Sequence, residues 1–211
     1  MKLYHVDWSP FARKVRIAAI ERGIDKQIEL IEVNIGFAEK TLKIIENDIT
    51  NYNPSGRIPT LITESGEAIY DSTVIVHYLD SIGSAPPIVP NSTKDKIKAL
   101  KLDALVQEVI DSLRLTNHEN KRKKEERLPD YINALDDKVK RGLAVLEEEV
   151  VNYSSSSSDI IDLGEISIAT LIGTIKRNPK SKYNIKRTNI DRWFDKLQLR
   201  DSLIKTKPPS L

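Results

Sequence analysis

Three short segments within the first eighty residues constrain the fold of this chain most strongly. They cover residues 8–16, 53–61 and 70–79. In the first segment, Ser9 is a favoured N-cap and Pro10 suits the first position of a helix. The start of a helix has unpaired N–H groups and a partial positive charge, so Ser9 lies where an anion would be stabilised. These residues alone leave a second interpretation open, in which Ser9 only caps the helix.

The other two segments also have features that suit contact with a ligand. Asp71 and Ser72 lie at the predicted start of another helix, where backbone N–H groups are again unpaired. Pro59 follows Ile58, and a cis proline would turn the chain sharply and free the backbone N–H and C=O of the residue before it. The alternatives are that Asp71 and Ser72 only cap a helix and that Pro59 is an ordinary proline of an edge strand.

Residues 1–80 have the pattern of a small α/β unit. Gly23 suits the end of the first helix, and Ser65-Gly66 suits the turn of a hairpin, because glycine readily adopts a positive φ. The apolar pattern predicts, in chain order, a strand at 2–6, a helix from 10 up to Gly23, a strand at 27–33, a helix at 38–49, a hairpin of strands at 58–62 and 67–70, and a helix at 71–82.

The remainder of the chain is predicted to be a linker followed by helices. Residues 81–92 are rich in glycine, serine, asparagine and proline, which is typical of a linker. Beyond it, apolar residues at helical spacing predict two long antiparallel helices at 94–114 and 128–151 and a final helix opened by Asn189. The serine tract at 154–158 predicts a flexible loop between helices.

The composition excludes several classes of protein and site. The 211 residues include no cysteine, which excludes disulfides, thiolate metal ligands and a cysteine nucleophile. The three histidines have no spacing typical of a zinc or iron site, so no metal is expected. No stretch approaches the roughly 18 uninterrupted apolar residues of a membrane span, and charged residues interrupt the start of the chain, where a signal peptide would be apolar. A cytoplasmic protein with no membrane partner is therefore expected.

The charge of the chain gives no reason to expect a nucleic-acid partner. The formal net charge is +2, with 33 Lys and Arg residues against 31 Asp and Glu residues. The basic run at 121–124 is followed at once by Glu125 and Glu126, which is typical of a solvated helix end. No binding of nucleic acid is therefore predicted.

The order and spacing of the three segments resemble those of the cytosolic glutathione transferase family, and the predicted β-α-β-α-β-β-α order is that of its N-terminal domain. The Ser-Pro-Phe start and the basic residues that follow it are similar to serine-type members, such as the tau class and bacterial members related to the stringent starvation protein. The resemblance implies a thioredoxin-like, glutathione-binding α/β domain at 1–80, a linker at 81–92 and an all-α helical domain at 93–211. It also implies a homodimer, in which the helix near residues 73–79 meets the first long helix of the twin subunit.

The resemblance also implies roles for residues of the three segments. Ser9 would donate a hydrogen bond to the glutathione thiolate. Asp71 and Ser72 would hold the amino-acid head of glutathione, with aspartate in place of the more usual glutamate. Pro59 would be cis, and the backbone of Ile58 would pair with the cysteinyl part of glutathione.

Further residues are candidates for binding the glycyl carboxylate of glutathione and the second substrate. Arg57 and Lys43 are rival candidates for holding the distant glycyl carboxylate of glutathione, and either could simply be solvated. The walls for a second substrate would come from Trp8, Phe11, Val106, Ile110 and Arg114. Each of these five side chains could instead serve only in packing.

Residues 164–170 resemble the capped helix start in the core of the family's C-terminal domain. Ser167 would cap this helix, while Ile166 and Leu171 would form a hydrophobic staple across its start. The family usually has an acidic residue where Thr170 stands, so this departure removes half of the expected capping pair.

The function implied by the resemblance is that of a glutathione transferase, an enzyme that adds the glutathione thiolate to a small, hydrophobic, soft electrophile, as in detoxification. Glutathione would be a substrate, and a mixed disulfide is excluded because position 9 is not cysteine. Two alternatives remain open. One is a non-catalytic regulatory or binding protein that resembles the stringent starvation protein, and the other is an isomerase or dehalogenase that uses glutathione.

Overall fold

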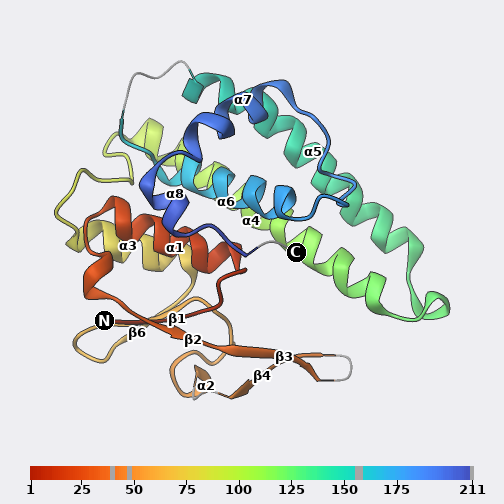
Figure 1. Ribbon diagram of the computed structural model, residues 1–211, viewed down its shortest axis with the longest axis horizontal. Coiled ribbons are helices and arrows are strands. Elements are labelled where there is room, and N and C mark those ends of the chain that lie inside the picture. Colours follow the sequence, from red (N-terminus) through yellow and green to blue (C-terminus); the bar gives the residue numbers. More distant parts are fainter. Residues whose placement is uncertain (39–40, 47–48, 155–158, 210–211) are drawn as a thin grey trace.

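The structure is a computed structural model that describes residues 1–38, 41–46, 49–154 and 159–209. An α/β part comes first and a helical part follows it (Figure 1). The first part contains β1 (Lys2–His5), α1 (Pro10–Glu21), the 3-10 turn η1 (Asp25–Gln27), β2 (Glu29–Glu32), β3 (Asn34–Ala38), β4 (Thr41–Glu46), α2 (Ile49–Tyr52), β5 (Thr60–Ile62), β6 (Ala68–Ile69) and α3 (Ser72–Ile82). The second contains α4 (Thr93–Lys121), the 3-10 turn η2 (Lys124–Glu126), α5 (Pro129–Ser154), α6 (Leu163–Arg177), α7 (Thr188–Leu197) and α8 (Asp201–Lys205).

The small main sheet of the α/β part is mixed and has the order β2-β1-β5-β6. β1 is parallel to β2 and antiparallel to β5, with Leu3 opposite both Leu30 and Leu61. The predicted hairpin is confirmed, since β5 pairs with β6 and Gly66 in the turn has a φ of 85°. Helices α1 and α3 cover one face of this sheet (Figure 1). The expected fold class, a thioredoxin-like α/β part followed by helices, is confirmed.

The two helices that cover the sheet begin where local chemistry predicts. The Ala12 N–H donates to Ser9 Oγ at 3.3 Å, and the Thr73 N–H donates to Asp71 Oδ1 at 2.9 Å. Each N-cap therefore satisfies an N–H group that the helix itself leaves unpaired. At the other end of α1, Gly23 has a φ of 69°, a backbone conformation that other residues rarely adopt.

The helix predicted at 38–49 is wrong for the described residues of that range. β4 replaces it and pairs antiparallel with β3, with Gly36 opposite Lys43, and the short helix α2 follows β4. β-branched residues occur in both strands, at Ile35 and at Ile44, and they favour an extended backbone because their χ1 freedom is restricted in a helix. Residues 39–40 and 47–48 lie outside the described part of the chain.

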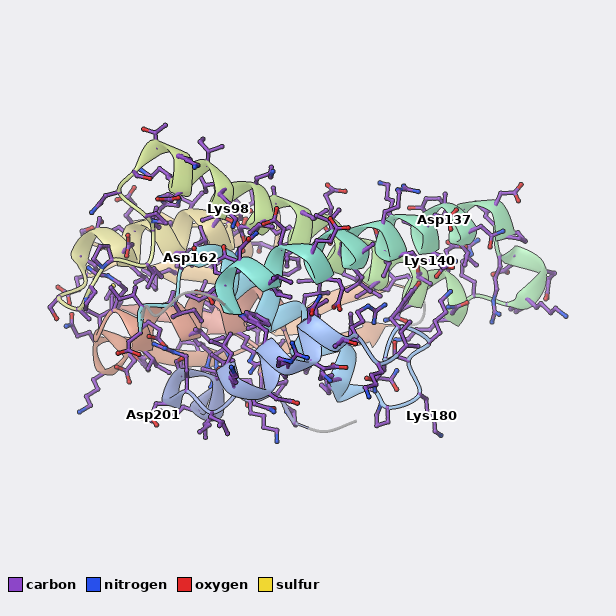
Figure 2. All side chains as sticks on the ribbon, turned by 90° about the horizontal axis from the view of Figure 1, so that it is seen from above. Lys98, Asp137, Lys140, Asp162, Lys180 and Asp201 are labelled. Atoms are coloured by element: carbon purple, nitrogen blue, oxygen red, sulfur yellow. The ribbon has the colours of Figure 1, made fainter. Side chains whose placement is uncertain are left out.

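The helical part is built on the long helices α4 and α5, which lie side by side (Figure 2). Gly142 of α5 faces Val109 of α4 so closely that a Cβ at this position would overlap the valine methyl group. The two predicted long helices are confirmed, and each extends beyond its predicted end. The predicted serine loop lies outside the described residues at positions 155–158.

Two predictions for the later helices are wrong. Helix α6 is capped by Asp162, whose Oδ1 accepts the Glu165 N–H at 2.9 Å, and Glu165 bonds back to the Asp162 N–H. The expected cap, Ser167, lies inside the helix because this reciprocal capping box starts the helix earlier. The helix near Asn189 is not the last, since α8 follows α7.

One core joins the two parts of the protein. Helix α6 lies at its centre and contacts both α1 and α4, and ten of its 15 residues are buried. Apolar residues of α1 and α3 belong to the same cluster as those of α4, α5 and α6. Among the described residues, no helix is both long enough and apolar enough to span a membrane.

Candidate functional site

The three sequence segments meet at one end of the α/β part. Tyr4 of β1 lies opposite Thr60 of β5, so the chain before Thr60 lies beside the loop that leads from β1 to Ser9. Helices α1 and α3 pack against each other, and Lys14 Nζ donates to Thr73 Oγ1 at 3.1 Å. The start of α1, the start of α3 and the loop before β5 are therefore neighbours.

Ser9 is buried at the start of α1, with 5% of its surface exposed. Its Oγ accepts the Ala12 N–H, and its own N–H donates to the Val6 carbonyl at 3.1 Å. Within the described part of the chain, the hydroxyl hydrogen of Ser9 has no acceptor. A hydroxyl has one donor and two lone pairs, so Ser9 can cap the helix and still donate to a ligand.

The loop before β5 contains the cis peptide bond Ile58–Pro59, which confirms the cis form implied by the resemblance. Buried Asn53 shapes this loop, because its Nδ2 donates to the Arg57 carbonyl and to Thr60 Oγ1, both at 3.0 Å. In the part of the chain that the structure describes, the backbone N–H and C=O of Ile58 have no hydrogen-bond partner. Ile58 can therefore pair with an extended ligand.

Asp71 and Ser72 leave polar atoms available at the start of α3. Asp71 Oδ1 accepts the N–H groups of Thr73 and Val74, at 2.9 and 3.3 Å, and its second oxygen has no partner among the described residues. The Ser72 hydroxyl makes no hydrogen bond within the same residues, although the residue is 2% exposed. An acceptor and a donor thus lie side by side, which suits a ligand head with both an ammonium and a carboxylate.

Arg57 and Lys43 are the two candidates for binding the glycyl carboxylate of glutathione, and the structure describes the side chain of Arg57 only. Arg57 is exposed and forms no ion pair with another described residue, so its guanidinium is available. Lys43 lies on β4 opposite Gly36, and its side chain is outside the described part.

The five residues proposed for the second substrate fall into two groups. Trp8 is 42% exposed, and Phe11 and Arg114 are half-buried. Val106 and Ile110 are only 1% and 5% exposed and pack within the core. Arg114 Nε lies 3.1 Å from Asp111 Oδ1. Only the first group therefore has surface accessible to a ligand.

A buried network of charged and polar side chains around Lys14 and Asp103 lies behind the site, and the sequence did not predict it. Lys14 Nζ and Asp103 Oδ1 lie 2.7 Å apart, and each side chain is 2% exposed. Asp103 also accepts from Thr73 Oγ1, Gln107 Nε2 and Ser167 Oγ at 2.5, 3.1 and 2.6 Å. Burial lowers the pKa of Lys14, and the charge of Asp103 opposes this effect. The network ties α1 and α3 to α4 and α6, and so fixes the relative positions of the two helix starts.

Arg13 is a second charged residue that the sequence analysis did not identify. It is 5% exposed, and its guanidinium donates to Thr206 Oγ1 at 3.4 Å and to the Leu203 carbonyl at 3.3 Å. A Cβ at Gly173 of α6 would overlap this guanidinium, so the glycine makes room for it. Burial, followed by the charge of Arg16, lowers the pKa of Arg13 to about 10. A buried cation that forms no ion pair with another described residue therefore lies one helical turn after Ser9.

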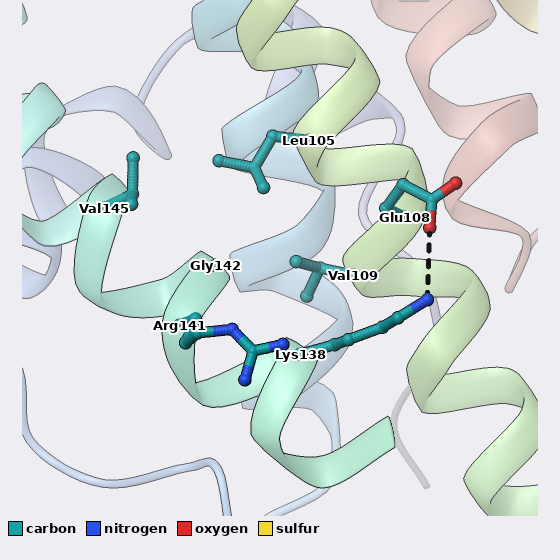
Figure 3. Close-up of a pocket in the computed structure, with 7 residues that line it drawn as sticks. All are labelled: Leu105, Glu108, Val109, Lys138, Arg141, Gly142 and Val145. Atoms are coloured by element: carbon teal, nitrogen blue, oxygen red, sulfur yellow. Dashed lines mark ion pairs between the residues drawn. The ribbon is translucent and has the colours of Figure 1, made fainter. Parts of the chain in front are cut away.

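A groove on the molecule lies away from these residues, between α4 and α5 (Figure 3). It encloses about 270 Å³ and is lined by Leu105, Glu108, Val109, Lys138, Arg141, Gly142 and Val145. Lys138 Nζ lies 3.8 Å from Glu108 Oε2 across the groove. Among the described residues, no group of three or more Asp, Glu or His side chains is arranged to hold a metal ion.

The chain is similar in sequence to known proteins. The family model for the glutathione S-transferase N-terminal domain matches residues 8–82, a range that includes all three segments. An uncharacterised protein of Escherichia coli K12, the GST-like protein YibF, is 28% identical over 210 residues, which are 99% of each chain.

Solved structures agree over the whole chain. A glutathione transferase family member from Pseudomonas fluorescens Pf-5 with bound glutathione has 28% identity and a TM-score of 0.87, and the match covers 99% of this chain and 98% of that one. A second structure of a family member from the same strain holds S-(propanoic acid)-glutathione, with 28% identity, a TM-score of 0.82, and coverage of 99% and 100%. The fold, the matched domain and these relatives agree: residues 8–82 match the N-terminal domain of the glutathione S-transferase family, and the whole chain is similar to members of that family.

Proposed function

We propose that this protein is a glutathione transferase of the serine type, which adds the glutathione thiolate to a soft electrophile. The observation that carries the proposal is the Ser9 hydroxyl. Its oxygen caps α1, its hydrogen has no acceptor among the described residues, and it lies beside the free backbone groups of the Ile58 loop. This arrangement supports donation of a hydrogen bond to a thiolate at the helix start.

The energy required for thiolate formation favours a role for Ser9 beyond capping. A thiol with a reference pKa of about 8.5 is roughly 3% ionised at pH 7, and lowering that pKa by ~2 units requires about 2.7 kcal/mol. A helix terminus typically supplies about 0.3–1 kcal/mol, whereas a hydrogen bond to a charged group supplies about 1.5–3 kcal/mol. The helix start alone is therefore insufficient, and the Ser9 O–H supplies the larger share.

The proposed binding mode of glutathione uses the groups that have no other partner. The free oxygen of Asp71 accepts from the ammonium of the head, and the hydroxyl and N–H of Ser72 donate to its carboxylate. The backbone of Ile58 pairs with the cysteinyl part, and Arg57 or Lys43 binds the glycyl carboxylate. Bound glutathione in the Pseudomonas fluorescens relative supports this choice of ligand.

The electrophile would enter beside the thiolate. This space would be lined by three side chains with accessible surface: Trp8, Phe11 and Arg114. The buried side chains of Val106 and Ile110 would lie behind them. A glutathione with an S-linked propanoic acid, bound in a second Pseudomonas fluorescens structure, supports room for a substituent on the sulfur.

We further propose domains at 1–80 and 93–211, a homodimer and a cytoplasmic location. Val74 of α3 and Ile97 of α4 are 52% and 58% exposed, which supports an interface that covers these two helices. A two-fold interface would pair α3 of one subunit with α4 of the other.

Calorimetric titration with glutathione tests the proposal, with Ser72→Ala as the variant and Ser81→Ala as its control on the same helix. Ser81 Oγ donates to the Tyr78 carbonyl at the far end of α3, so its loss leaves the helix start intact. Loss of a hydrogen bond to a charged group predicts weaker binding by about 10- to 100-fold for Ser72→Ala only. No heat with the unaltered protein would contradict the proposal and favour a regulatory protein without glutathione chemistry.

A further inference from the structure

The side chain of Asn53 is buried behind the loop that leads to β5, with 1% of its surface exposed. Its Oδ1 accepts the backbone N–H and the hydroxyl of Ser55, at 3.0 and 2.7 Å. Its Nδ2 donates to the Arg57 carbonyl and to Thr60 Oγ1, both at 3.0 Å. A side-chain amide has two donor hydrogens and two acceptor lone pairs, so the hydrogen-bonding capacity of Asn53 is fully used within this loop.

The Arg57 carbonyl is held by two buried side chains. Besides the bond from Asn53, it accepts the Thr60 hydroxyl at 2.8 Å. Thr60 is 0% exposed and belongs to β5 of the main sheet. The backbone N–H of Asn53 donates to the Ile49 carbonyl of α2 at 2.7 Å. The Arg57 carbonyl is therefore attached both to the sheet and to α2.

The position of this carbonyl also fixes the direction of a backbone donor. The peptide bond between Arg57 and Ile58 is planar and trans, so its C=O and its N–H point in opposite directions. The C=O points toward the buried side chains of Asn53 and Thr60. The N–H of Ile58 therefore points away from the interior, and Ile58 itself is only half-buried.

Water can satisfy an exposed N–H, so the missing protein partner of Ile58 does not by itself indicate a ligand. The fixed direction of the donor carries the argument instead. A donor that is already held in place loses little conformational freedom on binding, and this preorganisation strengthens a complex. A ligand with an extended peptide backbone offers a carbonyl to such a donor, and the cysteinyl residue of glutathione has one.

We propose that Asn53 and Thr60 are positioning residues for glutathione. They hold the Arg57–Ile58 peptide so that the Ile58 N–H donates to the cysteinyl carbonyl of the ligand. The inference rests on the proposed function and assigns part of the affinity for glutathione to two side chains that act through this peptide. Aspartate cannot replace Asn53 in the role, because a carboxylate has no N–H to donate and places another acceptor beside the Arg57 carbonyl.

Asn53→Asp tests the proposal, and Asn51→Asp is its matched control. Both variants replace an amide by a carboxylate of the same shape and change the net charge equally, but Asn51 is exposed on α2. Calorimetry uses S-methylglutathione, which has no thiol to ionise. Binding should be about 3- to 10-fold weaker for Asn53→Asp, the range expected for one hydrogen bond between neutral groups. Asn51→Asp should bind as tightly as the unaltered protein.

Thr60→Val and Thr60→Ser form a second pair of variants that leaves the charge unchanged. Valine has nearly the shape of threonine but lacks the hydroxyl that donates to the Arg57 carbonyl, whereas serine keeps it. Thr60→Val should weaken binding by the same range as Asn53→Asp, and Thr60→Ser should retain most of the affinity. The test thus does not depend on the folding of a variant with a buried carboxylate.

Nuclear magnetic resonance of the ¹⁵N-labelled protein distinguishes positioning from general damage to the site. In the unaltered protein, S-methylglutathione should shift the Ile58 amide proton downfield and slow its exchange with solvent, as a new hydrogen bond does. At saturating ligand, Asn53→Asp and Thr60→Val should reduce this response. The amide of Ser72, which is proposed to donate to the head of glutathione, should still respond.

Three outcomes would overturn the inference while the proposed function stands. One is an Ile58 response in both variants that equals that of the unaltered protein. Another is binding to the unaltered protein without any Ile58 response. The third is a joint loss of the Ile58 and Ser72 responses in both variants, which would mean general damage. Failure of the unaltered protein to bind either S-methylglutathione or glutathione would instead overturn the proposed function.

Discussion

Replacement of Lys14 by methionine is expected to destabilise the protein severely, because it leaves the Asp103 carboxylate without its cation. Both side chains are 2% exposed, and their charged atoms lie 2.7 Å apart. Breaking a buried ion pair by removing one partner costs about 3–5 kcal/mol. Asp103 retains hydrogen bonds from Thr73, Gln107 and Ser167, so we expect the lower end of that range. Methionine is similar in length to lysine and should not add a large cavity.

Thermal unfolding followed by circular dichroism would measure this effect. A chain of this size loses about 2–4 °C in Tm for each kcal/mol, so Lys14→Met should lower the Tm by roughly 6–12 °C. The matched control is Lys138→Met, which removes the cation of an ion pair whose side chains are 55% and 75% exposed and which joins α4 to α5 (Figure 3). The control should cost less than about 1 kcal/mol.

The double variant Lys14→Met/Asp103→Leu separates two contributions to the free energy of unfolding. One is the cost of leaving the Asp103 carboxylate unpaired, and the other is the loss of packing. Removal of both charges should recover part of the stability, since the buried carboxylate is then absent. Thr73, Gln107 and Ser167 would lose their acceptor, so recovery should be incomplete. The reasoning is refuted if Lys14→Met costs no more than Lys138→Met.

Two further predictions concern pH dependence and assembly. Burial and the charge of Asp162 raise the pKa of Glu165 from 4.5 to about 7, so its contribution to stability is fully present below about pH 4.5 and is lost as the pH rises toward 7. Glu165→Gln should therefore raise the Tm near pH 8 and change it little near pH 4.5, and equal shifts at both values would count against this account. Light scattering at micromolar concentration should give about twice the chain mass of 23.9 kDa, and a mass equal to one chain would argue against the proposed dimer.

The parts of the site that were predictable from sequence are those that depend on local chemistry. Ser9 and Asp71 were predicted at helix starts because side-chain caps act within three residues of the N–H groups that they satisfy. The N-cap of α6 could have been predicted by the same rule. Asp162 is followed three residues later by Glu165, the pattern of a capping box, whereas Ser167 was favoured by the resemblance.

The parts that were not predictable depend on contacts between distant segments. The sequence at 38–49 is compatible with either helix or strand, and its pairing with β3 decides the outcome. Lys14 and Asp103 are 89 positions apart, and a charged residue in a helix is usually solvated. One signal was available, since Asp103 lies at helical spacing between Ala99 and Val106 on the buried face of α4.

The most direct test of the central claim is the ionisation of bound glutathione in the Ser9→Ala variant, measured by thiolate absorbance as the pH is varied. Loss of the hydrogen bond should raise the pKa of the bound thiol by about 1–2 units and slow conjugation at neutral pH. Loss of the cap should also cost about 1 kcal/mol of stability, so the Tm is measured separately. Affinity for an S-alkyl glutathione, which has no thiol to ionise, should barely change. A thiol pKa that stays the same while the Tm falls would show that Ser9 is only a cap and would contradict the account.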